Sequence, residues 1–118
     1  MIEATFPATR GALPAILDWI QSHIASPRQQ LVAEEAVVNI IEYADSPSIT
    51  LIYDGRLTLR DSGKYFDLLA AQSRLDPNVP LQERHPGGMG IDLIKRFTSE
   101  IVYKREGEEN ILILRFLD

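Results

Sequence analysis

The sequence has no cysteine and only two histidines. A disulfide framework and a thiolate metal site are therefore excluded, and two imidazoles alone do not complete a structural zinc site. Long hydrophobic runs are missing as well, because no stretch approaches the roughly 20 apolar residues that span a membrane. The opening residues MIEATFPATR lack the basic start and apolar run of a signal peptide. We therefore expect a cytoplasmic protein that does not enter a membrane.

Positive charge is also in short supply. Lysine and arginine number 12 against 17 aspartates and glutamates, which gives a net charge of −5 and a pI near 5.0. This balance gives no reason to expect direct contact with nucleic acid or anionic lipid. The hydrophobic share of 45% and the charged share of 25% are ordinary for a globular protein. At this length of 118 residues, we expect residues 1–118 to form one domain.

Hydrophobic spacing predicts three helices and five strands. The helices are expected at 11–25, at about 27–44 and at 88–97. The middle helix is the best marked, because Ser26, Pro27 and Gln29 form a capping signature. The strands are expected at 2–6, 49–53, 56–60, 99–105 and 110–117. Asp54-Gly55 is expected as a two-residue turn that joins the second strand to the third.

The order of these elements favours an α+β two-layer sandwich, with helices on one face of a mixed, mostly antiparallel sheet. Segment 111–117 (ILILRFL) is apolar on both faces, so we expect it to be central or covered on both sides. Residues 61–87 are expected to be irregular, with at most one short helix near 66–73. Loops of this length inside a small domain are usually functional.

The middle helix carries the first candidate site. Glu35 and Asn39 are four residues apart and therefore share a helix face. A carboxylate and a carboxamide are oxygen ligands of the kind that Mg²⁺ prefers. The carboxylate could equally accept a proton from an attacking hydroxyl group. Taken alone, this spacing is also typical of a polar stripe that faces solvent.

The second candidate follows the third strand. Asp61 stands at the end of that strand, and Gly63 lets the backbone approach a ligand closely. A carboxylate here could accept a hydrogen bond from the exocyclic amine of adenine, whereas guanine presents a carbonyl at that position. An isolated Asp-x-Gly is usually no more than a turn.

The third candidate is a run of glycines at 87–90, which leads into the last helix. Exposed amides at a helix N-terminus bind phosphate groups well. The run is not a Walker A loop, because no Lys-Ser/Thr pair follows it, and it is not a dinucleotide-binding fingerprint. A flexible hinge is the alternative interpretation.

Taken in order, these three motifs resemble the Bergerat-type nucleotide-binding fold shared by gyrase, histidine kinases and MutL. The short spacing and the segment LDPNVPLQERHPGGMGIDLI are similar to the anti-sigma-factor serine kinases of the RsbW type. The resemblance implies ATP and Mg²⁺ as cofactors. It implies Glu35 as general base, Asn39 as the Mg²⁺ ligand, Asp61 with Gly63 at the adenine, Arg84 near the γ-phosphate, and Gly88 with Gly90 in the second glycine box.

The resemblance also implies partners. It implies a homodimer that phosphorylates a Ser or Thr of a STAS-type anti-sigma-factor antagonist and sequesters a sigma factor. Tyr43 departs from the pattern, because relatives often carry a histidine there. A tyrosine can pack and form hydrogen bonds at this position, but it does not titrate near neutral pH.

Two alternatives stay open. One is a module that binds nucleotide without catalysis and works as a switch, for example as a phosphatase activator. The other is the ATPase domain of a histidine kinase, which is expected to come with dimerisation helices and a phospho-acceptor domain that these residues do not contain.

Overall fold

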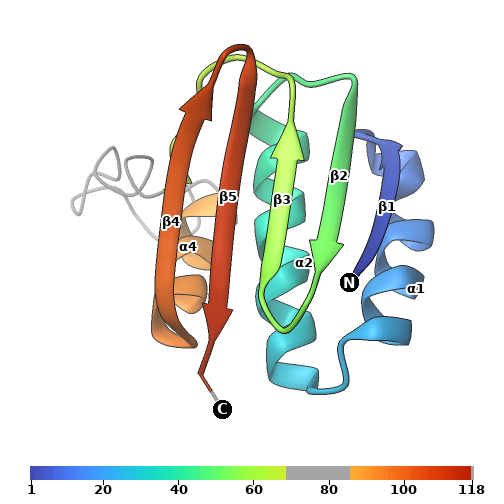
Figure 1. The fold of residues 1–118 in the computed structure, drawn as a ribbon, viewed down its shortest axis with the longest axis vertical. Helices are drawn as coiled ribbons and strands as arrows, with labels where there is room; N and C mark the ends of the chain where they lie inside the picture. The colour runs from blue at the N-terminus through green and yellow to red at the C-terminus, as the bar shows by residue number, and fades with distance from the viewer. Residues whose placement is uncertain (69–85, 118) are drawn as a thin grey trace.

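A computed structural model describes residues 1–68 and 86–117. A five-stranded sheet has the order β1-β2-β3-β5-β4, and all four of its pairings are antiparallel. The strands are β1 (Ile2–Pro7), β2 (Ser48–Tyr53), β3 (Leu57–Asp61), β4 (Thr98–Glu106) and β5 (Glu109–Phe116). The helices are a short 3-10 helix (Arg10–Ala12), α1 (Leu13–His23), α2 (Pro27–Tyr43) and α4 (Pro86–Arg96). The helices lie on one face of the sheet (Figure 1), which confirms the predicted α+β architecture.

The capping signature before α2 acts as predicted. The hydroxyl oxygen of Ser26 accepts a hydrogen bond from the backbone N–H of Gln29 at 3.4 Å, and Pro27 occupies the first helical position. The helix ends where the N–H of Ala44 donates to the carbonyl of Ile40. This helix forms the middle of the helical layer and carries the first candidate site.

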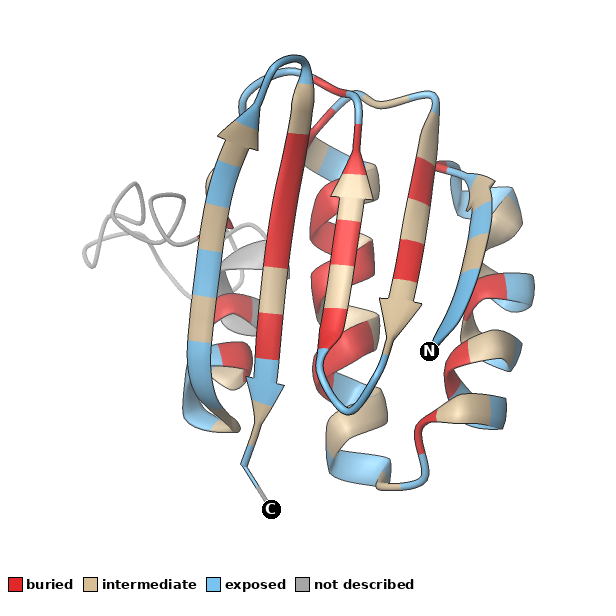
Figure 2. Cartoon of the chain, in the orientation of Figure 1, coloured by how far each residue is buried: buried red, intermediate tan, exposed pale blue. Residues whose placement is uncertain are grey.

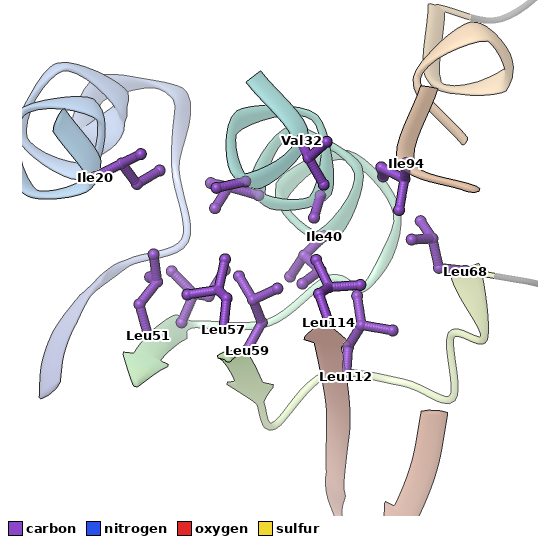
Figure 3. Close-up of a cluster of buried hydrophobic side chains, with 14 of the residues drawn as sticks. Ile20, Val32, Ile40, Leu51, Leu57, Leu59, Leu68, Ile94, Leu112 and Leu114 are labelled. Carbon is purple, nitrogen blue, oxygen red and sulfur yellow. The ribbon is translucent and has the colours of Figure 1, made fainter. Parts of the chain in front are cut away.

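The core lies between the sheet and the helices. Strand residues alternate between buried and partly exposed along β3 (Figure 2), as expected for a sheet covered on one face. Side chains from both layers meet in one cluster (Figure 3), with Ile20 from α1, Val32 and Ile40 from α2, Ile94 from α4, and Leu51, Leu57, Leu59, Leu112 and Leu114 from the strands. None of the described helices combines the length and apolarity needed to cross a bilayer.

The prediction that segment 111–117 is central in the sheet is confirmed, because β5 lies between β3 and β4. Leu112 and Leu114 face the helices. On the opposite face Ile111 is only 5% exposed, since the long side chains of Arg60 and Lys104 stand on the neighbouring strands beside it.

The predicted two-residue turn at Asp54-Gly55 is wrong by one residue. Tyr53 pairs with Leu57, so Asp54, Gly55 and Arg56 form a three-residue connection. Gly55 adopts a φ of 96°, which favours glycine, and the Asp54 carboxylate accepts from the N–H of Arg56 at 3.1 Å. The helix predicted near 66–73 falls mostly outside the described residues.

Candidate functional site

Glu35 and Asn39 lie one turn apart on α2, at the edge of its buried face. Asn39 is 1% exposed, and its Nδ2 donates to the backbone carbonyl of Glu35 at 2.7 Å. A carbonyl can only accept, so this bond fixes the amide with Oδ1 pointing away from the helix backbone. Among the described residues, Oδ1 has no hydrogen-bond partner. A buried oxygen without a partner is costly, so a ligand for it is expected.

Glu35 is half-buried beside Asn39. Burial raises the pKa of its carboxyl group above the ordinary value of 4.5, and the neighbouring negative charge of Glu34 raises it further. A carboxylate with a raised pKa is a stronger base. The predicted general base therefore has an environment that increases its basicity.

Asp61 ends β3 and is 4% exposed. Its Oδ1 accepts two hydrogen bonds, from the N–H of Gly63 at 2.9 Å and from Nδ2 of Asn110 at 2.9 Å. Both bonds from the described residues end on Oδ1, and Oδ2 accepts neither of them. The carboxylate is thus held in one orientation before any ligand arrives.

Gly63 is required because the turn presses against the end of α2. A Cβ at this position would lie 2.0 Å from the carbonyl oxygen of Ala44, far inside any permitted contact. The next residue fixes this approach, since the N–H of Lys64 donates to the same carbonyl at 2.8 Å. The Asp-x-Gly pattern predicts a glycine that makes room for a ligand, whereas in the structure Gly63 makes room for the end of α2. The Asp61 turn and the Glu35–Asn39 helix are therefore joined directly.

Asn110 is the site residue that sequence reasoning missed. It is 3% exposed and stands on β5 directly opposite Asp61. Its Nδ2 donates to Asp61 and to the carbonyl of Lys64, at 2.9 and 2.8 Å. One signal was present in the sequence: Asn110 is the polar member of an inward-facing row that continues with Leu112 and Leu114.

A small cavity of about 10 Å³ opens beside Asp61 and Asn110. It has room for a single water molecule rather than for a purine ring. The cavity is lined by Ile40 of α2, by Phe66 and Leu68 from the segment that follows the Asp61 turn, and by the strand residues Asp61, Tyr103, Asn110 and Leu112. A base bound to Asp61 must therefore lie outside this cavity or displace Phe66 or Leu68.

α4 begins at Pro86, two residues earlier than predicted, so Gly87 and Gly88 lie in its first turn and Gly90 lies at the start of the second. The first amides of a helix lack intrahelical acceptors, so those of Gly87 and Gly88 have no acceptor within α4 and could bind an anion. α4 packs against α2 and buries Ile91 and Ile94. The predicted γ-phosphate residue, Arg84, lies outside the described residues.

Three features of the site now stand together: a helix with Glu35 and a buried Asn39, a rigid Asp61 turn, and a glycine-led helix that packs on the first. A family model described as histidine kinase-like ATPase domain matches residues 6–116, almost the whole chain. The chain belongs to this ATPase family. No curated protein matches it.

Membership of this family means that the chain is an ATP-binding module. The Asn39 amide fits the Mg²⁺ that usually accompanies ATP, because its Oδ1 is oriented, buried and without a partner among the described residues. Within the same part of the chain, no group of three or more His, Cys, Asp or Glu side chains could hold a metal ion. A metal at Asn39 would therefore depend on phosphate oxygens for most of its ligands, as Mg²⁺ commonly does in phosphoryl-transfer enzymes.

Tyr43, the departure noted in the sequence, lies one turn beyond Asn39. Its ring packs against that of Phe66 with the centroids 5.7 Å apart. The tyrosine thus joins the end of α2 to the segment that follows the Asp61 turn, in addition to the Gly63 contact.

Proposed function

We propose that this ATPase-family chain is an ATP-dependent serine/threonine protein kinase. Its substrate would be a Ser or Thr of a STAS-type anti-sigma-factor antagonist, and the same protein would sequester a sigma factor. The observation that carries the proposal is the pair on α2. Glu35 is a half-buried carboxylate with a raised pKa, one turn from an amide oxygen that has no partner among the described residues.

The pair matches the two requirements of phosphoryl transfer to a hydroxyl group. A base must accept the hydroxyl proton, and a metal ligand must hold the cation that neutralises the phosphates. Glu35 supplies the base, and Asn39 Oδ1 supplies the metal ligand. A module that only bound nucleotide would need the second group but not the first.

The remaining residues bind and orient the nucleotide. Asp61 Oδ2 accepts from the exocyclic amine of adenine, and the first amides of α4 face the phosphates. ATP·Mg²⁺ supplies the transferable phosphoryl group. The hydroxyl oxygen forms a bond to the γ-phosphorus, the bond from that phosphorus to the ADP oxygen breaks, and the hydroxyl proton passes to Glu35.

A matched pair of variants tests the base. Glu35→Gln keeps size and hydrogen bonding but cannot accept the proton, so transfer should fall by about 10²–10⁴ while ATP affinity stays within a few-fold. Glu34→Gln makes the same change on the neighbouring, similarly half-buried residue. It should leave transfer intact at alkaline pH, where Glu35 is ionised with or without the charge of Glu34 beside it. The measurement is transfer of label from γ-labelled ATP to purified STAS-type proteins, together with calorimetric titration of ATP.

The stability of the product in acid separates the competing functions. Phosphoserine and phosphothreonine survive acid, whereas phosphohistidine is hydrolysed, so an acid-labile product would support the histidine-kinase alternative. Asn39→Ala should lose metal-dependent nucleotide binding as well as transfer, because it removes the metal ligand. If wild-type protein transfers nothing but Asn39→Ala abolishes an ATP-dependent complex with a partner, the switch function replaces the kinase.

The homodimer belongs to the same proposal. The described helices all lie on one face of the sheet and none of them covers the other, open face (Figure 1), where Val102 is 37% exposed. An uncovered sheet face with apolar residues is a surface that a second copy could cover. Light scattering over a range of concentrations, with and without ATP, tests this; a monomer in every condition would contradict it.

A further inference from the structure

The side-chain amide of Asn110 could in principle be rotated by half a turn, which would exchange its oxygen and nitrogen. In the observed orientation Nδ2 faces two acceptors, the carboxylate of Asp61 and the carbonyl of Lys64. In the rotated one, Oδ1 would face the same two acceptors and repel both. These two acceptors and the donors that face Oδ1 therefore hold the amide together in the observed orientation.

Three donors converge on the other side of this amide. Oδ1 accepts from the hydroxyl of Tyr103 at 2.5 Å, from Nη1 of Arg105 at 3.1 Å and from the N–H of Phe66 at 3.3 Å. A phenol can donate or accept, so Tyr103 would tolerate either orientation, whereas a guanidinium only donates. Arg105 and the backbone N–H of Phe66 therefore both favour the observed orientation, and of these two donors only Arg105 can be removed by substitution.

Arg105 is itself fixed at several points. Its Nη1 also donates to the carbonyl of Gly63 at 2.8 Å, and its Nε donates to the carbonyl of Gly107, at the β4–β5 turn, at 3.3 Å. The guanidinium is planar, so these bonds hold its donors in a fixed relation. One side chain therefore connects the β4–β5 hairpin to the glycine of the Asp61 turn.

We infer that Arg105 is a positioning residue for base recognition, which holds the Asn110 amide and the Gly63 carbonyl so that Asp61 Oδ1 stays occupied and Oδ2 faces the exocyclic amine. The inference rests on the proposed role of Asp61 in binding adenine. Arg105 does not touch the nucleotide in this arrangement. It acts through Asn110, and its effect is on the choice of base rather than on the phosphates.

The test compares ATP with purine riboside triphosphate, which lacks the exocyclic amine. In Arg105→Gln, the preference for ATP over this analogue should fall by about three- to tenfold, the loss expected for one hydrogen bond. Arg105→Lys should recover part of the preference, because an ammonium can still donate to one of the two acceptors. Lys104→Gln is the matched control: its side chain lies on the opposite face of β4, pairs with Glu106 at 3.2 Å, and should change nothing.

A second measurement does not depend on nucleotide. Both Nδ2 protons of Asn110 are hydrogen-bonded, so its side-chain amide signals should exchange slowly with solvent in the wild-type protein and faster in Arg105→Gln. If the signals stay protected and the preference is unchanged, the inference is wrong. It is equally wrong if Arg105→Gln lowers the melting temperature and weakens ATP and the analogue by the same factor, because Arg105 would then support only the fold.

These results also separate the inference from the proposed function. Wild-type protein that binds ATP no better than the analogue would remove Asp61 from the adenine site, whatever the Arg105 variants do. Wild-type protein that prefers ATP, with a preference unaffected by Arg105→Gln and Arg105→Lys, would overturn only the role of Arg105.

Discussion

Replacement of Gly63 by alanine probes the contact that joins the Asp61 turn to α2. The added Cβ would lie 2.0 Å from the carbonyl oxygen of Ala44, 2.8 Å from its carbonyl carbon and 3.1 Å from Asp61 Oδ1. Two of these atoms are backbone atoms of Ala44, the C-terminal cap of α2, so no side-chain rotation relieves the clash. The turn must move away and lose the Lys64–Ala44 and Gly63–Asp61 hydrogen bonds. Overpacking costs about 1–3 kcal/mol and each hydrogen bond about 1 kcal/mol, which together give roughly 3–5 kcal/mol.

That loss is a large fraction of the roughly 5–15 kcal/mol typical of a native domain, so urea denaturation measures it directly. Gly11→Ala is the matched control, because the nearest heavy atom to its Cβ would be Thr9 Oγ1 at 3.9 Å, an ordinary contact. The control should stay within about 0.5 kcal/mol of wild type. A Gly63→Ala protein as stable as the control, with unchanged ATP affinity, would show that the turn does not press on α2 as described.

Two further predictions concern the carboxylates. Asp61→Asn should weaken ATP binding about tenfold or more, because a charge-assisted hydrogen bond worth roughly 1.5–3 kcal/mol is lost; unchanged affinity in calorimetry would remove Asp61 from the site. Glu35 has a pKa raised by burial and by Glu34, so its ionised form destabilises the folded state. Its contribution is neutral below the ordinary glutamate pKa and turns unfavourable as the pH rises. Glu35→Gln should therefore be more stable than the wild type at neutral pH but not in acid. A variant whose denaturation midpoint equals that of the wild type at both pH values would contradict the raised pKa.

Most of the fold could be predicted because its signals are local. Apolar spacing and the Ser26-Pro27 cap mark α2, and the alternation of apolar residues marks the strands. The errors lie at boundaries, where the choice depends on one hydrogen bond. The connection at Asp54 has three residues instead of two because the Asp54 side chain caps Arg56, a preference that the Asp-Gly pair does not reveal.

The site was predictable only where its residues are close in sequence. Glu35 with Asn39 and Asp61 with Gly63 are short-range patterns. Asn110 and Arg105 reach the Asp61 turn through the pairing of β5 with β3 and with β4. That pairing depends on strand order, which periodicity does not give. In the sequence, such contacts are indicated only by a polar residue within an otherwise apolar strand.

The last prediction concerns the destabilising effect of the buried Asn39 side chain on the protein without nucleotide. Its Oδ1 is buried without a partner among the described residues, and such an acceptor costs about 1–3 kcal/mol. Asn39→Leu keeps the branched shape and removes the acceptor, and the Glu35 carbonyl still has its helical N–H donor. The variant should therefore be about 1 kcal/mol more stable than wild type without nucleotide, while losing the extra stability that ATP·Mg²⁺ gives the wild type.

Thermal unfolding with and without ATP·Mg²⁺ measures both effects for the same variant. Val38→Leu is a suitable control, since Val38 neighbours Asn39 on α2 but is only partly buried, and it should respond to ATP·Mg²⁺ like wild type. An Asn39→Leu protein that is less stable without nucleotide and still responds to ATP·Mg²⁺ would mean that the amide oxygen has a structural partner. If the protein gains stability and loses its response, this position has kept a destabilising group because the bound metal requires it.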